Sequence, residues 1–150
     1  MNMEPLTLPG ESEYLSQLLD YVTWVAAAYG LEEAAVYRLA LAVDEIATNI
    51  VLHGYREAGR SGDLTVWAES SAGRLIVYLE DSGQPFDPRE APHPPDLDRP
   101  LEERPDGGLG IYLALWGADS LHYEQVSGRN RTTFVMELPG TLPGGDEPQS

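Results

Sequence analysis

The sequence predicts an α+β fold in which helices cover one face of a mostly antiparallel mixed sheet. Apolar residues recur at helical spacing in the first third of the chain, up to about residue 53. In later segments apolar and polar residues alternate, as they do in strands with one buried face. Short turns join those segments in pairs, so they are predicted to form antiparallel hairpins.

The predicted elements of the first half are one strand and two helices. Two leucines spaced two apart predict a short strand over 4–9. Periodic apolar residues predict a helix over 11–29, which ends before Gly30. A second helix is predicted to begin at 31–33 and to stop at Gly54.

The second half is predicted to hold two hairpins separated by a long irregular segment. Alternation predicts strands over 64–69 and 75–80, and again over 121–126 and 132–138 around a turn over 127–130. The segment 81–110 is rich in Gly, Pro and Asp and has no periodicity, which is typical of a functional lid or of disorder. We interpret it as a lid.

Length and composition predict one soluble domain. A chain of 150 residues fits a single core, and we expect one folded domain over 1–138 followed by a flexible tail over 139–150. The chain has no cysteine and no apolar run long enough to cross a bilayer. These features predict a cytoplasmic protein without disulfides or membrane anchoring.

The charges exclude several functions. A formal net charge of −16 argues against direct, sequence-independent binding of nucleic acid, which depends on basic side chains. All nine basic residues are arginine, so the P-loop lysine, the kinase β3 lysine and Schiff-base chemistry are excluded. A bound phosphate would therefore need backbone N–H groups, a metal ion or an arginine.

The second predicted helix carries two polar side chains beside its core-facing stripe. Glu45 and Asn49 lie four residues apart, so their Cβ atoms are expected about 5–6 Å from each other. A carboxylate there could accept a proton, and an amide oxygen could ligate a metal. Taken by itself, the pair is more typical of a solvated helix face.

Two further motifs follow. Asp81 comes at a predicted strand end with Gly83 two residues on, where a carboxylate could accept from the amine of a flat ring such as adenine. A plain turn has the same pattern. Glycines in the segment 106–110 precede a predicted short helix over 109–116, where backbone N–H groups could bind an anion.

In combination and in this order, the helical Glu-x-x-x-Asn, the Asp-x-Gly and the Gly-Gly-Leu-Gly motifs resemble the GHKL ATPase superfamily of gyrase, the heat-shock chaperone, histidine kinases and MutL. Within it, NIVLHGY, DSGQPFDP, LEERPDGGLGIYL and GRNRTTFVMEL resemble the bacterial anti-sigma-factor serine/threonine kinases. The resemblance extends from the first strand to about Leu138. It implies a two-layer α/β sandwich, the Bergerat ATP-binding fold.

The resemblance implies roles for the motif residues toward ATP and Mg²⁺. Asn49 would ligate Mg²⁺. Glu45 would orient or deprotonate the attacking hydroxyl. Asp81 would accept from the adenine amino group while Gly83 lets the ring approach. The phosphates would lie on backbone N–H groups of the loop that contains Gly107, Gly108, Leu109 and Gly110.

Three assignments stay open at this point. Thr133, or its neighbour Thr132, would lie beside the base and assist Asp81. His53 is compatible with packing at the helix end or with contact to phosphate. Arg104 could reach the γ-phosphate, and a solvated arginine is equally compatible with its position.

The implied activity is transfer of the γ-phosphate of ATP to a serine or threonine of an anti-anti-sigma partner. The implied second partner is a sigma factor held inactive, and the implied assembly is a homodimer that binds ATP or ADP. The alternative is a nucleotide-binding regulatory module that switches a partner without transferring phosphate.

Overall fold

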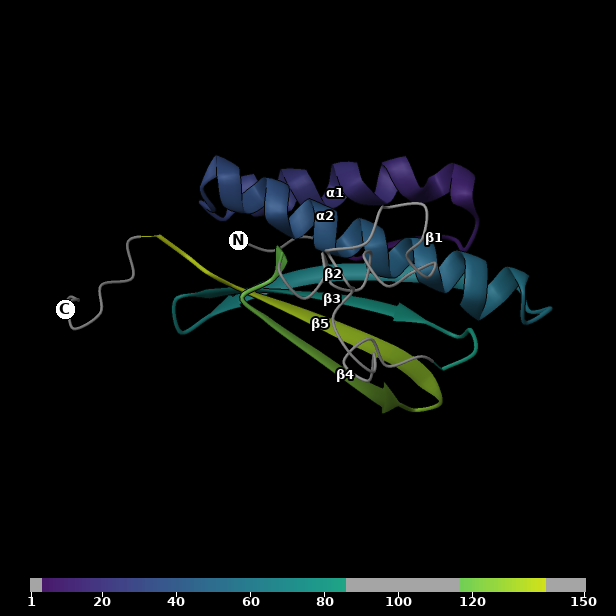
Figure 1. The fold of residues 1–150 in the computed structure, drawn as a ribbon. Helices are drawn as coiled ribbons and strands as arrows, with labels where there is room; N and C mark the ends of the chain where they lie inside the picture. The colour runs from purple at the N-terminus through teal and green to yellow at the C-terminus, as the bar shows by residue number, and fades with distance from the viewer. Residues whose placement is uncertain (1–3, 86–116, 140–150) are drawn as a thin grey trace, which may run out of the picture.

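Two consecutive helices, α1 (Leu15–Ala28) and α2 (Glu33–Asn49), lie on one face of a five-stranded sheet in the computed structural model (Figure 1). The structure describes residues 4–85 and 117–139. The predicted glycine loop and nearly all of the predicted lid and tail lie outside these residues. The described part has two layers, so the predicted α+β fold is confirmed.

The sheet order is β1-β2-β3-β5-β4, and each described pairing is antiparallel. The predicted predominance of antiparallel pairing is confirmed, and no pairing among the described strands is parallel. Their bounds are β1 Leu6–Pro9, β2 Asp63–Ser71, β3 Arg74–Asp81, β4 Ser120–Val126 and β5 Arg129–Glu137.

Both predicted hairpins form, and their turns are tight. Ala72 and Gly73 have φ of 54° and 78°, and Ser127 and Gly128 have φ of 53° and 81°. Two successive positive φ values match the twist of the flanking strands, as in a type I′ hairpin turn. The second turn is shorter than the predicted one, so Asn130 lies within β5 and takes part in strand pairing.

The helical segments differ from prediction at two ends. The first helix opens with a 3₁₀ turn, η1 (Ser12–Tyr14), and α2 continues into the wider turns of η2 (Ile50–Arg56). Gly54 was expected to end the helix, and that prediction is wrong. Its φ is not positive, and its carbonyl accepts a hydrogen bond from Gln84 N at 2.8 Å.

The core lies between the helices and the sheet. The α2 side chains of Leu39, Val43 and Ile46 are buried there, as the helical stripe predicts. Strand β5 alternates, so Phe134 and Met136 are buried while Thr133 and Val135 are partly exposed. This alternation fixes which face of the sheet each neighbouring side chain occupies.

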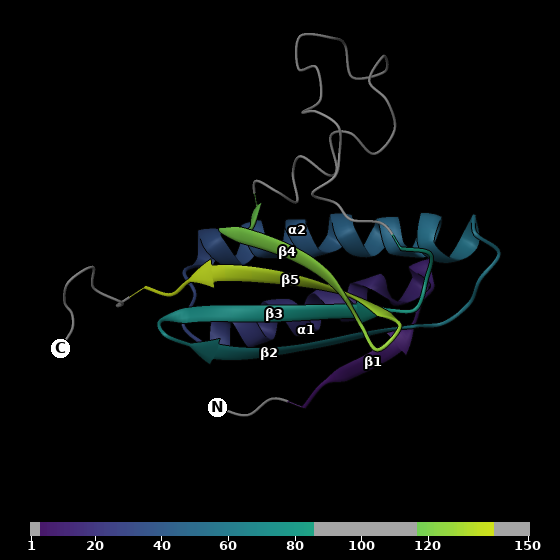
Figure 2. The same cartoon turned by 90° about the horizontal axis from the view of Figure 1, so that it is seen from below.

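No described helix covers the opposite face of the sheet (Figure 2). Trp67 stacks on Tyr78 with ring centroids 5.0 Å apart. The guanidinium of Arg131 lies over both rings, 5.2 Å from the first centroid and 5.6 Å from the second. Among the residues that the structure describes, no helix is both long and apolar enough to span a membrane.

Candidate functional site

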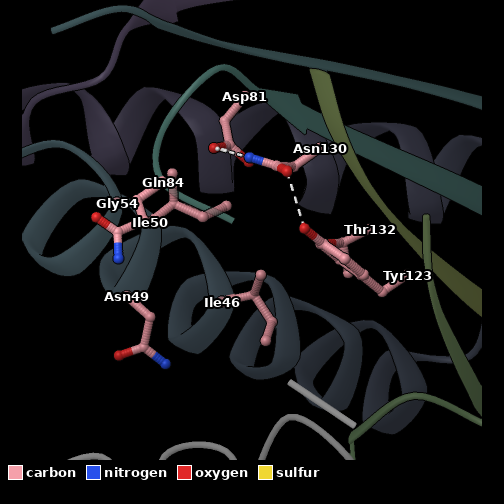
Figure 3. A pocket seen from close by; sticks show the side chains of 9 residues that line it. All are labelled: Ile46, Asn49, Ile50, Gly54, Asp81, Gln84, Tyr123, Asn130 and Thr132. Atoms are coloured by element: carbon pink, nitrogen blue, oxygen red, sulfur yellow. Dashed lines mark hydrogen bonds between the residues drawn. The ribbon is translucent and has the colours of Figure 1, made fainter. Parts of the chain in front are cut away.

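A cavity opens where the end of α2 and the start of η2 face the sheet (Figure 3). The elements that line it are these helical turns, the end of β3 with the turn that follows, β4 and β5. Its lining residues are Ile46, Asn49, Ile50, Gly54, Asp81, Gln84, Tyr123, Asn130 and Thr132.

Asp81 is the charged group of this lining. Its side chain is 3 % exposed, and its Oδ2 accepts from Gly83 N at 2.8 Å and from Asn130 Nδ2 at 3.1 Å. Burial raises the pKa of the Asp81 carboxyl, and the two hydrogen bonds and the charge of Arg129 oppose that rise. Within the described residues no hydrogen bond reaches Oδ1, so this oxygen can accept from a ligand.

Asn130 is the central polar group of the cavity, and the sequence reasoning missed it. Besides its bond to Asp81, Nδ2 donates to Gly83 O at 2.9 Å. Its Oδ1 accepts from Tyr123 Oη at 2.8 Å and from Gln125 Nε2 at 3.3 Å. The alternation along β5 could have revealed it, because Asn130 lies two residues before Thr132 and therefore on the same buried face of the strand.

Gly83 serves close backbone packing. A Cβ at this position would lie 2.8 Å from Gly54 O and 2.9 Å from Gly54 C. The two backbones approach because Gln84 N donates to Gly54 O. The space that a side chain at this position would need is therefore occupied by the backbone of η2.

Tyr55 connects η2 to the sheet, a role that its place in the sequence does not reveal. Its hydroxyl donates to Asp63 O at 2.6 Å and accepts from Ser82 N at 2.8 Å. Burial raises the pKa of Tyr55, and its bonds to Ser82 oppose the rise. The buried ring therefore ties the floor of the cavity to the ends of β2 and β3.

The alternation of β5 decides between the two threonines. Thr132 is 3 % exposed and lines the cavity. Thr133 pairs with Tyr78 and His122 on the other face of the sheet and does not line the cavity. The preference for Thr133 is therefore corrected to Thr132, because successive side chains of a strand point to opposite faces.

Asn49 and Glu45 lie at the helical end of the site. Asn49 is the last residue of α2 and lines the cavity at the end away from Asp81 (Figure 3). Glu45 lies one turn earlier, outside the lining and partly exposed. Partial burial, followed by the charge of Asp44, raises the pKa of the Glu45 carboxyl, which suits a proton acceptor.

The described residues contain no group of three or more His, Cys, Asp or Glu side chains that could hold a metal. An amide oxygen such as that of Asn49 fits Mg²⁺, which commonly keeps several waters and takes its other ligands from phosphate. The donor set therefore fits a cation that arrives with a nucleotide better than a resident metal.

His53 lies on the surface of η2, where its side chain contacts Glu57. Its Nδ1 lies 2.7 Å from Glu57 Oε1, and the two side chains are 49 % and 65 % exposed. It does not line the cavity. Arg104 and the loop with Gly107, Gly108, Leu109 and Gly110 lie outside the described residues.

The chain matches a known domain family over most of its length. Residues 8–136 match the family described as the histidine kinase-like ATPase domain. The chain therefore belongs to the histidine kinase-like ATPase family.

Relatives and solved structures refine this placement. The serine-protein kinase RsbW of Halalkalibacterium halodurans is 30 % identical over 126 residues, which cover 82 % of this chain and 76 % of that protein. The RsbW of Bacillus cereus is 30 % identical over 111 residues, which cover 72 % and 68 %. Within the family, the chain groups with the anti-sigma-factor serine kinases.

Two solved structures share the fold. The RsbU and RsbW domains of Rv1364c from Mycobacterium tuberculosis match with a TM-score of 0.60 at 16 % identity, covering 91 % of this chain and 33 % of that one. The histidine kinase domain of the blue-light activated histidine kinase EL346 from Erythrobacter litoralis matches with a TM-score of 0.51 at 15 % identity. The second match covers 84 % of this chain and 60 % of that one.

Proposed function

We propose that this protein is an ATP- and Mg²⁺-dependent anti-sigma-factor serine/threonine kinase, with the cavity beside Asp81 as its adenine site. The observation that carries the proposal is the buried Asp81 carboxylate, whose Oδ2 accepts two hydrogen bonds while Oδ1 accepts none from the described residues. Such a group suits an exocyclic amine, which donates N–H and would satisfy Oδ1. Thr132 adds a buried hydroxyl beside it.

The phosphate end of ATP would lie toward Asn49. The amide oxygen of this residue would complete the coordination of Mg²⁺, and the cation would neutralise charge on the transferring phosphoryl group. The glycine loop around Gly107, Gly108, Leu109 and Gly110 would hold phosphate through backbone N–H groups, with Arg104 as the candidate cation. Phosphate binding without lysine requires such groups.

Glu45 is the proposed catalytic base. It lies one helical turn before Asn49, so a hydroxyl brought to the γ-phosphate would meet its carboxylate. A raised pKa keeps this carboxyl a better proton acceptor than a fully solvated one. The proposed phosphoacceptor is a serine or threonine of an anti-anti-sigma protein.

The proposed regulatory partner is a sigma factor that the protein sequesters, in a homodimeric assembly in the cytoplasm. This proposal is supported by the sequence similarity to the RsbW kinases and by the acidic composition of the chain. A net charge of −16 favours encounter with a partner that carries a basic face.

Radiolabelled ATP, Mg²⁺ and a candidate partner protein test the proposal. Wild-type protein should yield phosphoserine or phosphothreonine, and Glu45→Gln should lower the transfer rate by a hundredfold or more, on the order of the contribution of a positioned base. Binding of ATP should stay within about twofold, because the γ-phosphate contacts remain. Asp44→Asn is the comparison variant, in which the adjacent carboxylate that accepts from Thr48 Oγ1 at 3.3 Å loses its charge. It should lower the transfer rate much less than Glu45→Gln, because burial, the larger cause of the raised Glu45 pKa, remains.

The outcomes separate the two classes of function. Equal transfer by Glu45→Gln and wild type would remove Glu45 from the base role. Binding of ATP by the wild type without transfer to any partner would favour the nucleotide-binding regulatory module instead.

A further inference from the structure

The Asn130 amide has one possible orientation in this site. The two groups that face its Nδ2, Asp81 Oδ2 and Gly83 O, can only accept. The two groups that face its Oδ1, Tyr123 Oη and Gln125 Nε2, donate to it. A flipped amide would set its oxygen against Asp81 Oδ2 and Gly83 O, which are both acceptors, so these two contacts fix the direction of the N–H groups.

This direction determines what Asp81 can offer to a ligand. Two N–H donors occupy Oδ2, from Gly83 and from Asn130. The carboxylate is thereby held in one rotamer with Oδ1 as the remaining acceptor. Adenine carries an amino group at the position where guanine carries a carbonyl oxygen. An amino group donates to Oδ1, whereas a carbonyl oxygen would face its lone pairs.

We propose that Asn130 is the positioning residue that orients Asp81 and thereby makes the cavity select adenine over guanine nucleotides. The inference rests on the proposed function, because it requires a nucleotide base beside Asp81. Asn130 acts through Asp81, and its role is seen in base selectivity and in the pH dependence of binding.

The groups around Asp81 define the expected pH dependence. Arg129 from β5 stabilises the carboxylate form, and Glu80 from β3 opposes it. The hydroxyl of Tyr55 faces the site from η2, and that of Tyr123 faces it from β4. On β2 the residue opposite Asp81 is Leu64, which does not titrate. The acid next to it, Asp63, forms an ion pair with Arg129, and its backbone oxygen accepts from the Tyr55 hydroxyl.

Two substitutions of Asn130 then act in different ways. Asn130→Ala removes one donor to the carboxylate, which favours the protonated form of Asp81. Asn130→Asp keeps the shape but sets a second carboxyl near the 3.1 Å contact, and two such carboxyls share one proton. With the proton shared, the second carboxyl can donate to Asp81 as the amide did; once both are ionised, the pair repels.

Calorimetric titration of ATP and of GTP, each with Mg²⁺, from pH 5.5 to 8.5 provides the test. Wild type should prefer ATP and should lose affinity as the pH falls. Asn130→Ala should weaken ATP roughly tenfold, the equivalent of a hydrogen bond to a charged group, and should lower the ATP-to-GTP preference. Asn130→Asp should show the opposite pH trend and lose ATP affinity as the pH rises.

Tyr123→Phe and Gln125→Ala complete the series. Tyr123→Phe removes the shorter of the two bonds that orient the amide and should lower the ATP-to-GTP preference by a smaller factor of about three. Gln125→Ala is the matched control, because it removes only the longer 3.3 Å bond and leaves the amide held by Tyr123. Its preference should stay within about twofold of wild type.

The outcomes decide the proposal. If Asn130 had only a structural role, its substitution would weaken the binding of ATP and of GTP by the same factor and leave the pH trend unchanged. That result would overturn the proposal. If circular dichroism shows that the Asn130 variants do not fold, Tyr123→Phe decides, and an unchanged ATP-to-GTP preference then counts against the proposal. If wild type itself binds neither nucleotide, or binds them identically to Asp81→Asn, the proposed function fails rather than the role of Asn130.

Discussion

The contact between Gly83 and Gly54 allows a sharp test of how the cavity is built. In Gly83→Ala the new Cβ would lie 2.8 Å from Gly54 O, 2.9 Å from Gly54 C and 3.1 Å from Asp81 Oδ2. The first two atoms belong to the backbone of η2 and cannot swing aside as a flexible side chain would. The turn after β3 must therefore move away from the helix.

The cost can be worked from these contacts. Overpacking of this kind costs about 1–3 kcal/mol. Separation of the backbones also weakens the 2.8 Å hydrogen bond from Gln84 N to Gly54 O, which contributes about 1 kcal/mol. The lower entropy of the unfolded alanine chain offsets about 0.4–1 kcal/mol. We expect Gly83→Ala to lower the free energy of unfolding by roughly 1–3 kcal/mol.

The matched control is Gly54→Ala, on the other side of the same contact. A Cβ there would meet no atom closer than 3.6 Å, and the position lies within a helical turn at negative φ. Since alanine is the better helix former by about 0.5–1 kcal/mol, this variant should be neutral or more stable.

Urea unfolding followed by circular dichroism measures both variants. Gly83→Ala should have the lower midpoint at an unchanged denaturant slope, and it should also bind ATP more weakly because Asp81 shifts with the turn. Equal midpoints for the two variants would refute the packing argument. A loss of stability in Gly54→Ala alone would mean that the tight packing lies on the Gly54 side of the contact, contrary to this argument.

Two further predictions concern the cavity. Because burial raises the folded-state pKa of Asp81 above its unfolded value, the folded state binds this proton more tightly, and stability falls as the pH rises through that interval. Asp81→Asn should therefore melt at a higher temperature than wild type at pH 7 while losing ATP binding, and the difference in melting temperature should shrink below about pH 4; a lower melting temperature at pH 7 would contradict this sign. Thr132→Ala should weaken ATP about three- to tenfold in calorimetric titration, whereas Thr133→Ala, on the open face, should match wild type. The reverse order would restore the original preference for Thr133.

Local patterns in the sequence were sufficient for the elements and for part of the site. The buried face of α2, which includes Leu39, Val43 and Ile46, follows from a period of 3.6 residues, and the two hairpins follow from a period of 2. Both periods appear in the sequence because each element buries one face. Asp81 was predicted at a strand end, and the structure places it there, in the cavity that Asn49 also lines.

The errors arose where a residue's role depends on a distant partner. Gly54 resembles a helix end in the sequence, yet its backbone is engaged by Gln84, thirty positions later. Asn130 resembled a turn residue because the length of the turn was unknown. In the structure the turn consists only of Ser127 and Gly128. Asn130 therefore lies in β5, where its amide contacts Asp81.

The sequence by itself determined the α+β layering, the family and the acid at the end of β3, since these depend on local periodicity and on short motifs. Only the tertiary structure decided that Thr132 rather than Thr133 faces the cavity, that Gly83 packs against η2, and that Asn130 orients the carboxylate. The physical reason is that strand phase and hydrogen-bond partners are set by pairing between segments that lie dozens of residues apart.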